Sequence, residues 1–192
     1  MKTKFIWLGI FAGLLTIIAV LLVVFKVANH EQEAFTSPDL KWAHLQGHVK
    51  SVTTTISYDG STYDETMEFD EDGMCIFASE VRVDRNDGGQ ITMTAEEEYK
   101  TKYFYNEAGY LESQNSNECD WSVWERFTLD ERGWIVSSES EGCGDYTINT
   151  FSYSDIDENG NWLKATEESV YEEEGEKISA TETITRKITY WE

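Results

Sequence analysis

The chain has 192 residues, of which 37 are acidic and 15 are basic, and its formal net charge is −22. This charge argues against nucleic acid and anionic lipid as partners, because both are bound by basic surfaces. It does not indicate disorder, since 40% of the residues are hydrophobic and 14% are aromatic. The sequence therefore predicts a folded, acidic protein of one or two domains.

The N-terminal residues predict a membrane anchor. Residues 1–4 are basic, and residues 5–25 form an uncharged apolar run, long enough to cross ~30 Å of hydrocarbon as a helix. A cleaved signal peptide is the alternative, but its apolar region usually has only about 7–15 residues. No small-x-small cleavage site follows the run. We therefore expect an uncleaved transmembrane helix at 5–25.

The charges beside the apolar run set its expected orientation. Two lysines precede it and one follows, after which the chain becomes acidic. Since basic residues tend to remain in the cytoplasm, residues 1–4 are expected there. The polar stretch 26–36 is interpreted as a linker, and residues 37–192 as a domain exported to the periplasm or the exterior of a bacterium.

A short helix is expected at the start of the exported domain, at about 38–46. Ser37 is a preferred N-cap residue, and Pro38 suits the first helical position. Asp39 complements the positive end of the helix, and Gly47 is expected to end it.

Beyond the helix the sequence alternates with a period of two. Thr and Ser alternate with apolar residues in 51–58, and the same pattern returns in 180–190. Such alternation predicts half-buried strands. The only proline of the chain, Pro38, precedes this region, so no proline interrupts the strand pairing.

A five-residue turn recurs between these strands. Each copy has an apolar residue, Asp or Asn, Glu, any residue, and Gly. The Asp or Asn caps the turn with its own side chain, and Gly adopts the positive φ that closes the hairpin. The Asp or Asn and the Gly of the four copies are Asp70 and Gly73, Asn106 and Gly109, Asp130 and Gly133, and Asp157 and Gly160. Shorter turns are expected at 59–60 and 86–89.

These features predict an all-β fold, an antiparallel meander of repeated β-hairpins with about nine to eleven strands. Tandem hairpins cannot bury a face alone, so the sheet must stack or curl. Both an open sheet and a barrel-like closure fit the pattern. One transmembrane helix and one short helix are expected to precede the sheet.

Three segments resemble a known family. LKWAHLQGHVKSV at 40–52 resembles the opening of exported YD-repeat-like (RHS-like) proteins of Bacteroidetes. DENGNW at 157–162 and TRKITY at 185–190 are similar to their closing repeat. The resemblance covers residues 40–192 and implies a β-rich scaffold without a shared set of catalytic residues. The chain departs from the family in lacking a strict Tyr-Asp pair at most turns, and it is too short to form the enclosing shells of the large members.

The cysteines suggest one disulfide. Cys119 and Cys143 flank one of the repeat hairpins. If Leu129 faces Trp134 across that hairpin, the two cysteines lie within one residue of facing each other, within the reach of a disulfide. An exported domain permits such a bond. Cys75 directly follows another turn and is expected to be a free, half-buried thiol.

The chain offers few residues for metal binding or catalysis. Asp155, Asp157 and Asn159 match the first half of an EF-hand-like loop, but Thr166 stands where its bidentate Glu belongs, so they are only weak calcium candidates. No phosphate loop, nucleophile elbow or cofactor fingerprint is present in the sequence. We therefore assign no catalytic residue and no cofactor, and do not expect an enzyme.

Aromatic residues gather in the central hairpins, and most are expected in the core. A possible contact face is formed by four tryptophans, although strand alternation places the first two on opposite faces. These tryptophans are Trp121, Trp124, Trp134 and Trp162.

The sequence therefore predicts a membrane-anchored, extracytoplasmic binding or interaction module without catalytic activity, whose partner is a protein of unknown identity. One alternative is a β-barrel that carries a small apolar ligand. A less favoured alternative is a hydrolase that uses a pair of acidic side chains.

Overall fold

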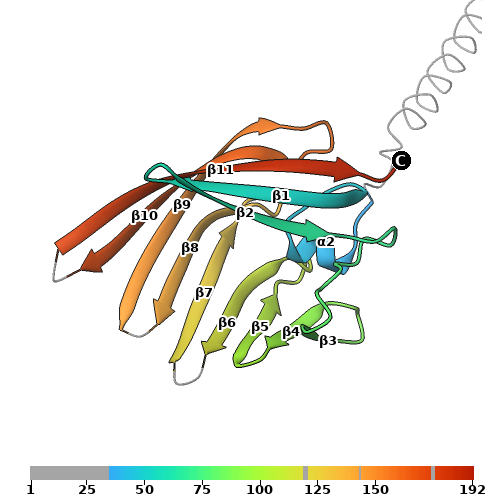
Figure 1. Cartoon of the computed structure of the whole chain (residues 1–192), viewed down its shortest axis with the longest axis horizontal. Helices are drawn as coiled ribbons and strands as arrows, with labels where there is room; N and C mark the ends of the chain where they lie inside the picture. Colours follow the sequence, from blue (N-terminus) through green and yellow to red (C-terminus); the bar gives the residue numbers. More distant parts are fainter. Residues whose placement is uncertain (1–34, 119–120, 143, 174–175) are drawn as a thin grey trace, which may run out of the picture. The chain divides into compact units, whose positions relative to one another are not determined.

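The structure, a computed structural model, describes residues 35–118, 121–142, 144–173 and 176–192. They belong to one compact unit, Phe35–Glu192. In these ranges the chain forms a short helix and eleven strands in a single antiparallel sheet (Figure 1). The expected all-β meander is thus confirmed. The segments 1–4 and 5–25 lie outside the described residues, and no helix within the described part is long and apolar enough to cross a membrane.

The strands follow one another as a meander from β3 to β11. Strand β11 also pairs with β1, and β1 with β2, so that β2 and β3 form the two edges of an open sheet. The elements are α2 (Pro38–Trp42), β1 (Val49–Tyr58), β2 (Ser61–Glu68), β3 (Arg82–Arg85), β4 (Ile91–Glu96), β5 (Tyr99–Tyr105), β6 (Leu111–Glu118), β7 (Trp121–Leu129), β8 (Ile135–Gly142), β9 (Asp145–Ile156), β10 (Trp162–Glu173) and β11 (Glu176–Tyr190).

The repeated turns have the geometry that their sequence implies. In the β7–β8 turn, Oδ1 of Asp130 accepts hydrogen bonds from the backbone N–H groups of Arg132 (2.9 Å) and Trp134 (3.0 Å). Gly133 closes the turn at φ 82 and donates to the Asp130 carbonyl. The segment 86–89, for which we expected a shorter turn, is a further copy of this turn, because Asn86 makes the same contacts to Gly88 and Gln90.

The short helix begins as expected but ends early. The Ser37 side chain accepts a hydrogen bond from the Leu40 N–H, as an N-cap does, and Pro38 is the first helical residue. The helix ends at Trp42 rather than near residue 46, because His44 adopts φ 54. Its ring Nδ1 donates to the Gly133 carbonyl (2.7 Å), and this contact with a distant turn outweighs the local helical preference.

Residues 35–48, called the strap below, cross the turns at one end of the sheet. The strap makes five hydrogen bonds to four turns, because the last bond returns to the turn where the first was made. The bonds are Ser37 Oγ to Gly73 O (2.6 Å), Lys41 Nζ to Ala108 O (2.9 Å), His44 Nδ1 to Gly133 O (2.7 Å), Asn161 Nδ2 to Gln46 O (2.8 Å) and His48 Nε2 to Glu71 O (2.7 Å).

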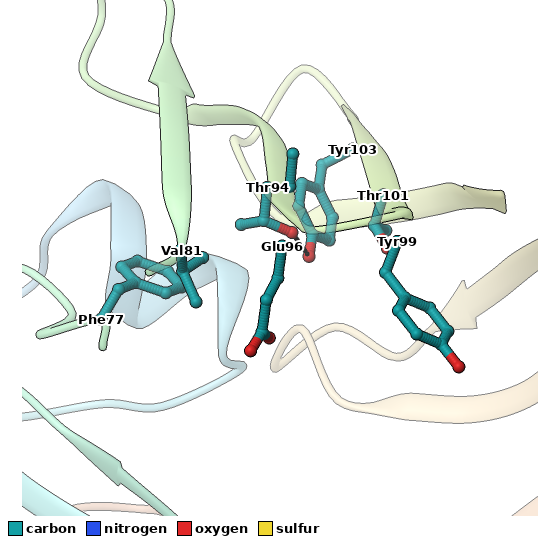
Figure 2. A pocket seen from close by; sticks show the side chains of 8 residues that line it. Phe77, Val81, Thr94, Glu96, Tyr99, Thr101 and Tyr103 are labelled. Atoms are coloured by element: carbon teal, nitrogen blue, oxygen red, sulfur yellow. Dashed lines mark hydrogen bonds between the residues drawn. The ribbon is translucent and has the colours of Figure 1, made fainter. Parts of the chain in front are cut away.

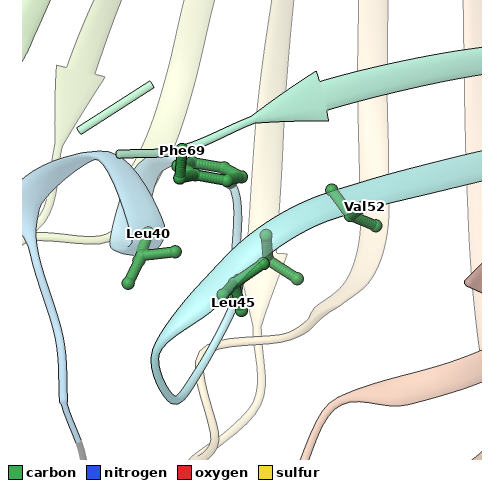
Figure 3. Close-up of a cluster of buried hydrophobic side chains, with 6 residues drawn as sticks. Leu40, Leu45, Val52 and Phe69 are labelled. Atoms are coloured by element: carbon green, nitrogen blue, oxygen red, sulfur yellow. The ribbon is translucent and has the colours of Figure 1, made fainter. Parts of the chain in front are cut away.

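A hydrophobic cluster fastens the strap to the sheet. Leu40 and Leu45 of the strap pack with Val52 and Phe69, and each of these side chains is at most 1% exposed (Figure 3). Full burial of such a side chain contributes about 1.5–3 kcal/mol. The cluster therefore makes the strap an integral part of the domain core.

A buried ion pair adds a polar contact at the same place. Asp39 is fully buried, and its carboxylate accepts hydrogen bonds from Arg85 Nη1 (2.6 Å) and Nη2 (2.7 Å). The backbone N–H of Cys75 also donates to it (2.7 Å). This pairing satisfies a charge that would otherwise be costly in the core.

The sheet has two distinct faces. We call the face on which α2 packs the inner face, and the opposite one the outer face (Figure 1). Directly paired residues of neighbouring strands point to the same side. The recorded pairing therefore assigns Val52, Phe127 and Tyr103 to the inner face and Phe104 and Trp124 to the outer face.

Candidate functional site

An apolar patch lies on the outer face of the sheet. The rings of Phe104 and Trp124 stack with centroids 5.6 Å apart, although Phe104 is 42% and Trp124 41% exposed. Tyr146, Ile148 and Val170 are exposed to a similar degree on neighbouring strands. These five residues are called the outer patch. Exposed aromatic groups of this kind are typical of interaction surfaces.

The strand pairing explains why these residues gather. Ile148 pairs directly with Val170, and the Glu141 that pairs with Trp124 pairs in turn with Tyr146. A depression of about 470 Å³ is lined by Arg126, Glu139 and Ser113, and Ser113 is the residue that pairs with Phe104. The outer patch therefore combines apolar rings with both signs of charge.

Tyr146 connects the apolar and the charged parts of the outer patch. Desolvation, together with the nearby Glu139 carboxylate to which the Tyr146 hydroxyl donates a hydrogen bond, raises the pKa of Tyr146. The charge of Glu141 also raises the pKa of Tyr146, whereas the charge of Arg126 lowers it. The Tyr146 hydroxyl is therefore a neutral hydrogen-bonding group at neutral pH.

A separate pocket of about 280 Å³ lies on the inner face beside the strap (Figure 2). Phe77 and Val81 form one side, and Thr94, Glu96 and Tyr103 face them from strands β4 and β5. The strap residue Trp42 makes an edge contact with the Tyr103 ring (5.6 Å). The pocket is mainly aromatic and aliphatic, with a single carboxylate in its lining.

Deeper on the inner face, aromatic rings form a buried layer. Trp134 and Trp162 are 1% and 6% exposed, and the Tyr153 ring lies 5.1 Å from each of them. The Arg186 guanidinium stacks 3.6 Å above the Trp162 ring. We call Trp134, Tyr153, Trp162 and Arg186 the inner layer.

The possible contact face of four tryptophans is therefore corrected. Trp134 and Trp162 belong to the core, because they pack against Ala165 and Ile184. Trp121 and Trp124 are exposed, but they lie on opposite faces of β7. Only Trp124 belongs to the outer patch, and its neighbours there are phenylalanine, tyrosine and aliphatic residues.

Arg186 is in an unusual environment for a charged side chain. Its Nε and Nη1 atoms are buried without a hydrogen-bond partner, and no described carboxylate forms an ion pair with it. Burial lowers the pKa of Arg186 to about 10, so the guanidinium stays charged at neutral pH. Burying an unpaired ion costs several kcal/mol, and the contact with Trp162 offsets about 2 kcal/mol of this.

Three carboxylates lie further along the inner face. Glu167 pairs directly with Glu182 across β10 and β11. Burial, and then the charges of Glu182 and Glu125, raise the pKa of Glu167 to about 7. A hydrolase would need a cleft around such a pair. Neither of the two cavities described above has Glu167 or Glu182 in its lining.

Of the weak calcium candidates Asp155, Asp157 and Asn159, the carboxylate of Asp157 has a structural role. Oδ1 of Asp157 accepts hydrogen bonds from the N–H groups of Asn159 (3.0 Å) and Asn161 (2.8 Å), and its other oxygen accepts from the Tyr190 hydroxyl. One oxygen of the Asp157 carboxylate thereby caps its own turn, and the other binds strand β11. In the described part of the chain, no group of three or more metal-ligating residues that could hold an ion was found.

The cysteine predictions are tested only in part. Cys119 and Cys143 lie outside the described residues. The assumed register is corrected, since Leu129 pairs with Ile135 rather than with Trp134, after an irregularity at the end of β7. Cys75 is a half-buried free thiol, and burial, followed by the charge of Asp39, raises its pKa to about 12. Such a thiol is a poor nucleophile.

Comparisons with known proteins give little guidance. No family model and no curated protein matches the chain, so the resemblance to YD-repeat-like proteins stays a prediction. A solved structure of a porin-like protein from Bacteroides uniformis is similar over 73% of this chain and 96% of its own length, with 11% sequence identity and a TM-score of 0.45. A likeness at this level carries no argument about function.

Proposed function

We propose that the chain is a membrane-anchored, extracytoplasmic interaction module that binds a protein partner through the outer patch and has no catalytic activity of its own. The observation that carries the proposal is the stacked pair of Phe104 and Trp124, which remains about two-fifths exposed on the outer face of an ordered sheet. Tryptophan, tyrosine and arginine are the residues that contribute most to protein interfaces.

The sheet itself suits this role. The two rings are placed on strands β5 and β7, which flank β6 in a rigid sheet, so binding requires little ordering of the surface. Arg126 and Glu139 lie between the apolar residues and can select a partner by charge. The alternative of a β-barrel that carries a small apolar ligand has less support, because the sheet is open at β2 and β3.

Quantitative affinity capture from the native envelope tests the proposal. The full-length protein is compared with Trp124→Ala, Phe104→Ala and the control Tyr63→Ala, whose ring is 64% exposed on edge strand β2. Because each removed side chain is exposed, all variants should unfold at nearly the same temperature. Loss of a central aromatic contact of about 2 kcal/mol weakens binding about 30-fold.

We expect one partner to be recovered with the parent and with Tyr63→Ala and to be lost with the two patch variants. Purified partner and calorimetry then give the affinity ratio directly. Equal recovery with Trp124→Ala and Tyr63→Ala would place the interface elsewhere. A parent protein that captures nothing beyond the double variant Phe104→Ala, Trp124→Ala would contradict a protein partner altogether.

A further inference from the structure

The pocket on the inner face beside the strap is open to solvent. Its volume of about 280 Å³ is close to the lower end of the range for ligand pockets, about 300 Å³, so it suits a small ligand. Phe77 and Val81 in its lining are half-buried, whereas Glu96 and Tyr99 are exposed. A small molecule can therefore reach these side chains from the solvent.

The apolar walls of the pocket are held by the strap. The Trp42 ring contacts the rings of Phe77 and Tyr103, with centroids 6.0 and 5.6 Å away. The Tyr103 hydroxyl shares a hydrogen bond of 2.9 Å with Oγ1 of Thr94, which also lines the pocket. Walls that are fixed before binding lose little conformational entropy when a ligand enters.

Glu96 places a negative charge among these rings. It pairs directly with Tyr99 across the β4–β5 hairpin, so both side chains lie on the same face of the sheet. Figure 2 shows the Glu96 side chain extending between Phe77 on one side and Tyr99 on the other. Among the described residues, no lysine or arginine forms an ion pair with Glu96. Its carboxylate therefore remains available to a ligand.

The charges around the pocket favour a positively charged ligand. Arg82 and Lys100 both pair with Ala95. Since Ala95 and Glu96 are consecutive in a strand, these two cations point to the opposite face from Glu96. The chain as a whole has 37 acidic and 15 basic residues, so its field attracts cations and repels anions.

An organic cation fits this pocket better than a metal ion does. Calcium takes about six to eight oxygen ligands, and the search of the described residues found no group of three or more side chains that could hold a metal. Aromatic rings, in contrast, attract ammonium groups that lie within about 6 Å of their centres. The combination of one carboxylate with several rings is therefore suited to an ammonium group that carries an apolar body.

We propose that the pocket binds a small organic monocation, whose ammonium group pairs with Glu96 and whose apolar body packs on Phe77 and Tyr103. The Tyr99 ring, which is the direct strand partner of Glu96, can contact the same ammonium group. This site lies on the opposite face from the outer patch and does not depend on a protein partner.

Phenylethylammonium is a suitable probe, because phenylethanol has nearly the same shape without the charge. The full-length protein in a neutral detergent at low salt is titrated with each compound by calorimetry, and the heats measured with detergent alone are subtracted. We expect phenylethylammonium to bind at least about fivefold more tightly than phenylethanol, since hydrogen bonds between charged groups are the stronger ones. Equal binding of the two compounds, or no binding of phenylethylammonium, would overturn the proposal.

A matched pair of variants assigns the effect to the pocket. Glu96→Gln and Glu97→Gln remove the same charge at consecutive positions, but only Glu96 lines the pocket. Glu96→Gln should weaken the binding of phenylethylammonium at least about fivefold and leave that of phenylethanol nearly unchanged, whereas Glu97→Gln should keep both affinities. Equal weakening in the two variants would show that the overall charge of the protein attracts the probe, and would refute the assignment.

A variant of the outer patch separates the two surfaces. Trp124→Ala removes an exposed ring from the opposite face and should leave the affinity for phenylethylammonium unchanged. Loss of binding in Trp124→Ala together with full binding in Glu96→Gln would place the probe on the outer patch and contradict the proposal.

Discussion

The ion pair between Asp39 and Arg85 gives a sharp test of how the strap is held. Arg85→Met removes the cation and leaves a carboxylate that is fully buried. Removal of one partner of a buried pair costs about 3–5 kcal/mol. Arg85 is itself 27% exposed, and the Cys75 N–H continues to donate to Asp39, so the lower end of this range applies. We expect a loss of about 3 kcal/mol, or about 6–12 °C in melting temperature.

Urea unfolding at pH 7, followed by tryptophan fluorescence, measures this loss. Arg82→Met is the matched control, because Arg82 and Asp84 form an ion pair whose side chains are 71% and 40% exposed. Such a pair contributes about 0–1 kcal/mol. Adding Asp39→Asn to Arg85→Met should restore about half of the lost stability, since the buried charge is then gone. Equal losses for Arg85→Met and Arg82→Met would refute the reasoning.

Two further predictions concern a turn and a carboxylate. Gly133→Ala should lower the free energy of unfolding in urea by about 1–3 kcal/mol more than Gly60→Ala does. Both residues have positive φ, but only at Gly133 would the new Cβ lie 2.6 Å from the Tyr110 ring. Equal losses of stability in the two variants would contradict this prediction. Glu167 has its pKa raised from 4.5 to about 7 in the folded state, so the folded protein holds the proton more tightly and stability should fall as pH rises from about 4.5 to 7. Glu167→Gln should remove this part of the pH dependence, and an unchanged slope would show that Glu167 does not cause it.

The regular parts of the fold could be predicted from local sequence. The turn at Asp130 and Gly133 follows from the chemistry of those two residues alone, since the carboxylate caps nearby N–H groups and glycine accepts the positive φ. The segment 86–89 departs from the repeated pattern, since Asp87 stands where the other four copies have Glu. The side-chain oxygen of Asn86 nevertheless makes the turn. The presence of this oxygen therefore predicts the turn better than the full five-residue pattern does.

The strap and the positions of the exposed and buried tryptophans could not be predicted in this way. His44 ends the helix because it reaches Gly133, which is 89 positions away in the sequence. Trp124 lies in an outward position of β7 and is 41% exposed, whereas Trp134 follows the Gly133 turn into the core and is 1% exposed. Their difference depends on strand register and on the side to which the sheet curls, and neither is encoded within a short window.

The strap has a consequence for the order in which the molecule can be completed. Gln46 leaves the ribosome early, yet its partner Asn161 is made more than a hundred residues later. Strand β1 likewise waits for β11, the last strand, before its second edge is paired. Pairings between distant segments fold slowly, because a long loop must close before any contact is gained. The strap therefore stays unanchored at the far side until the last strands are available, and the arrival of β10 and β11, rather than the formation of the first hairpins, completes the domain.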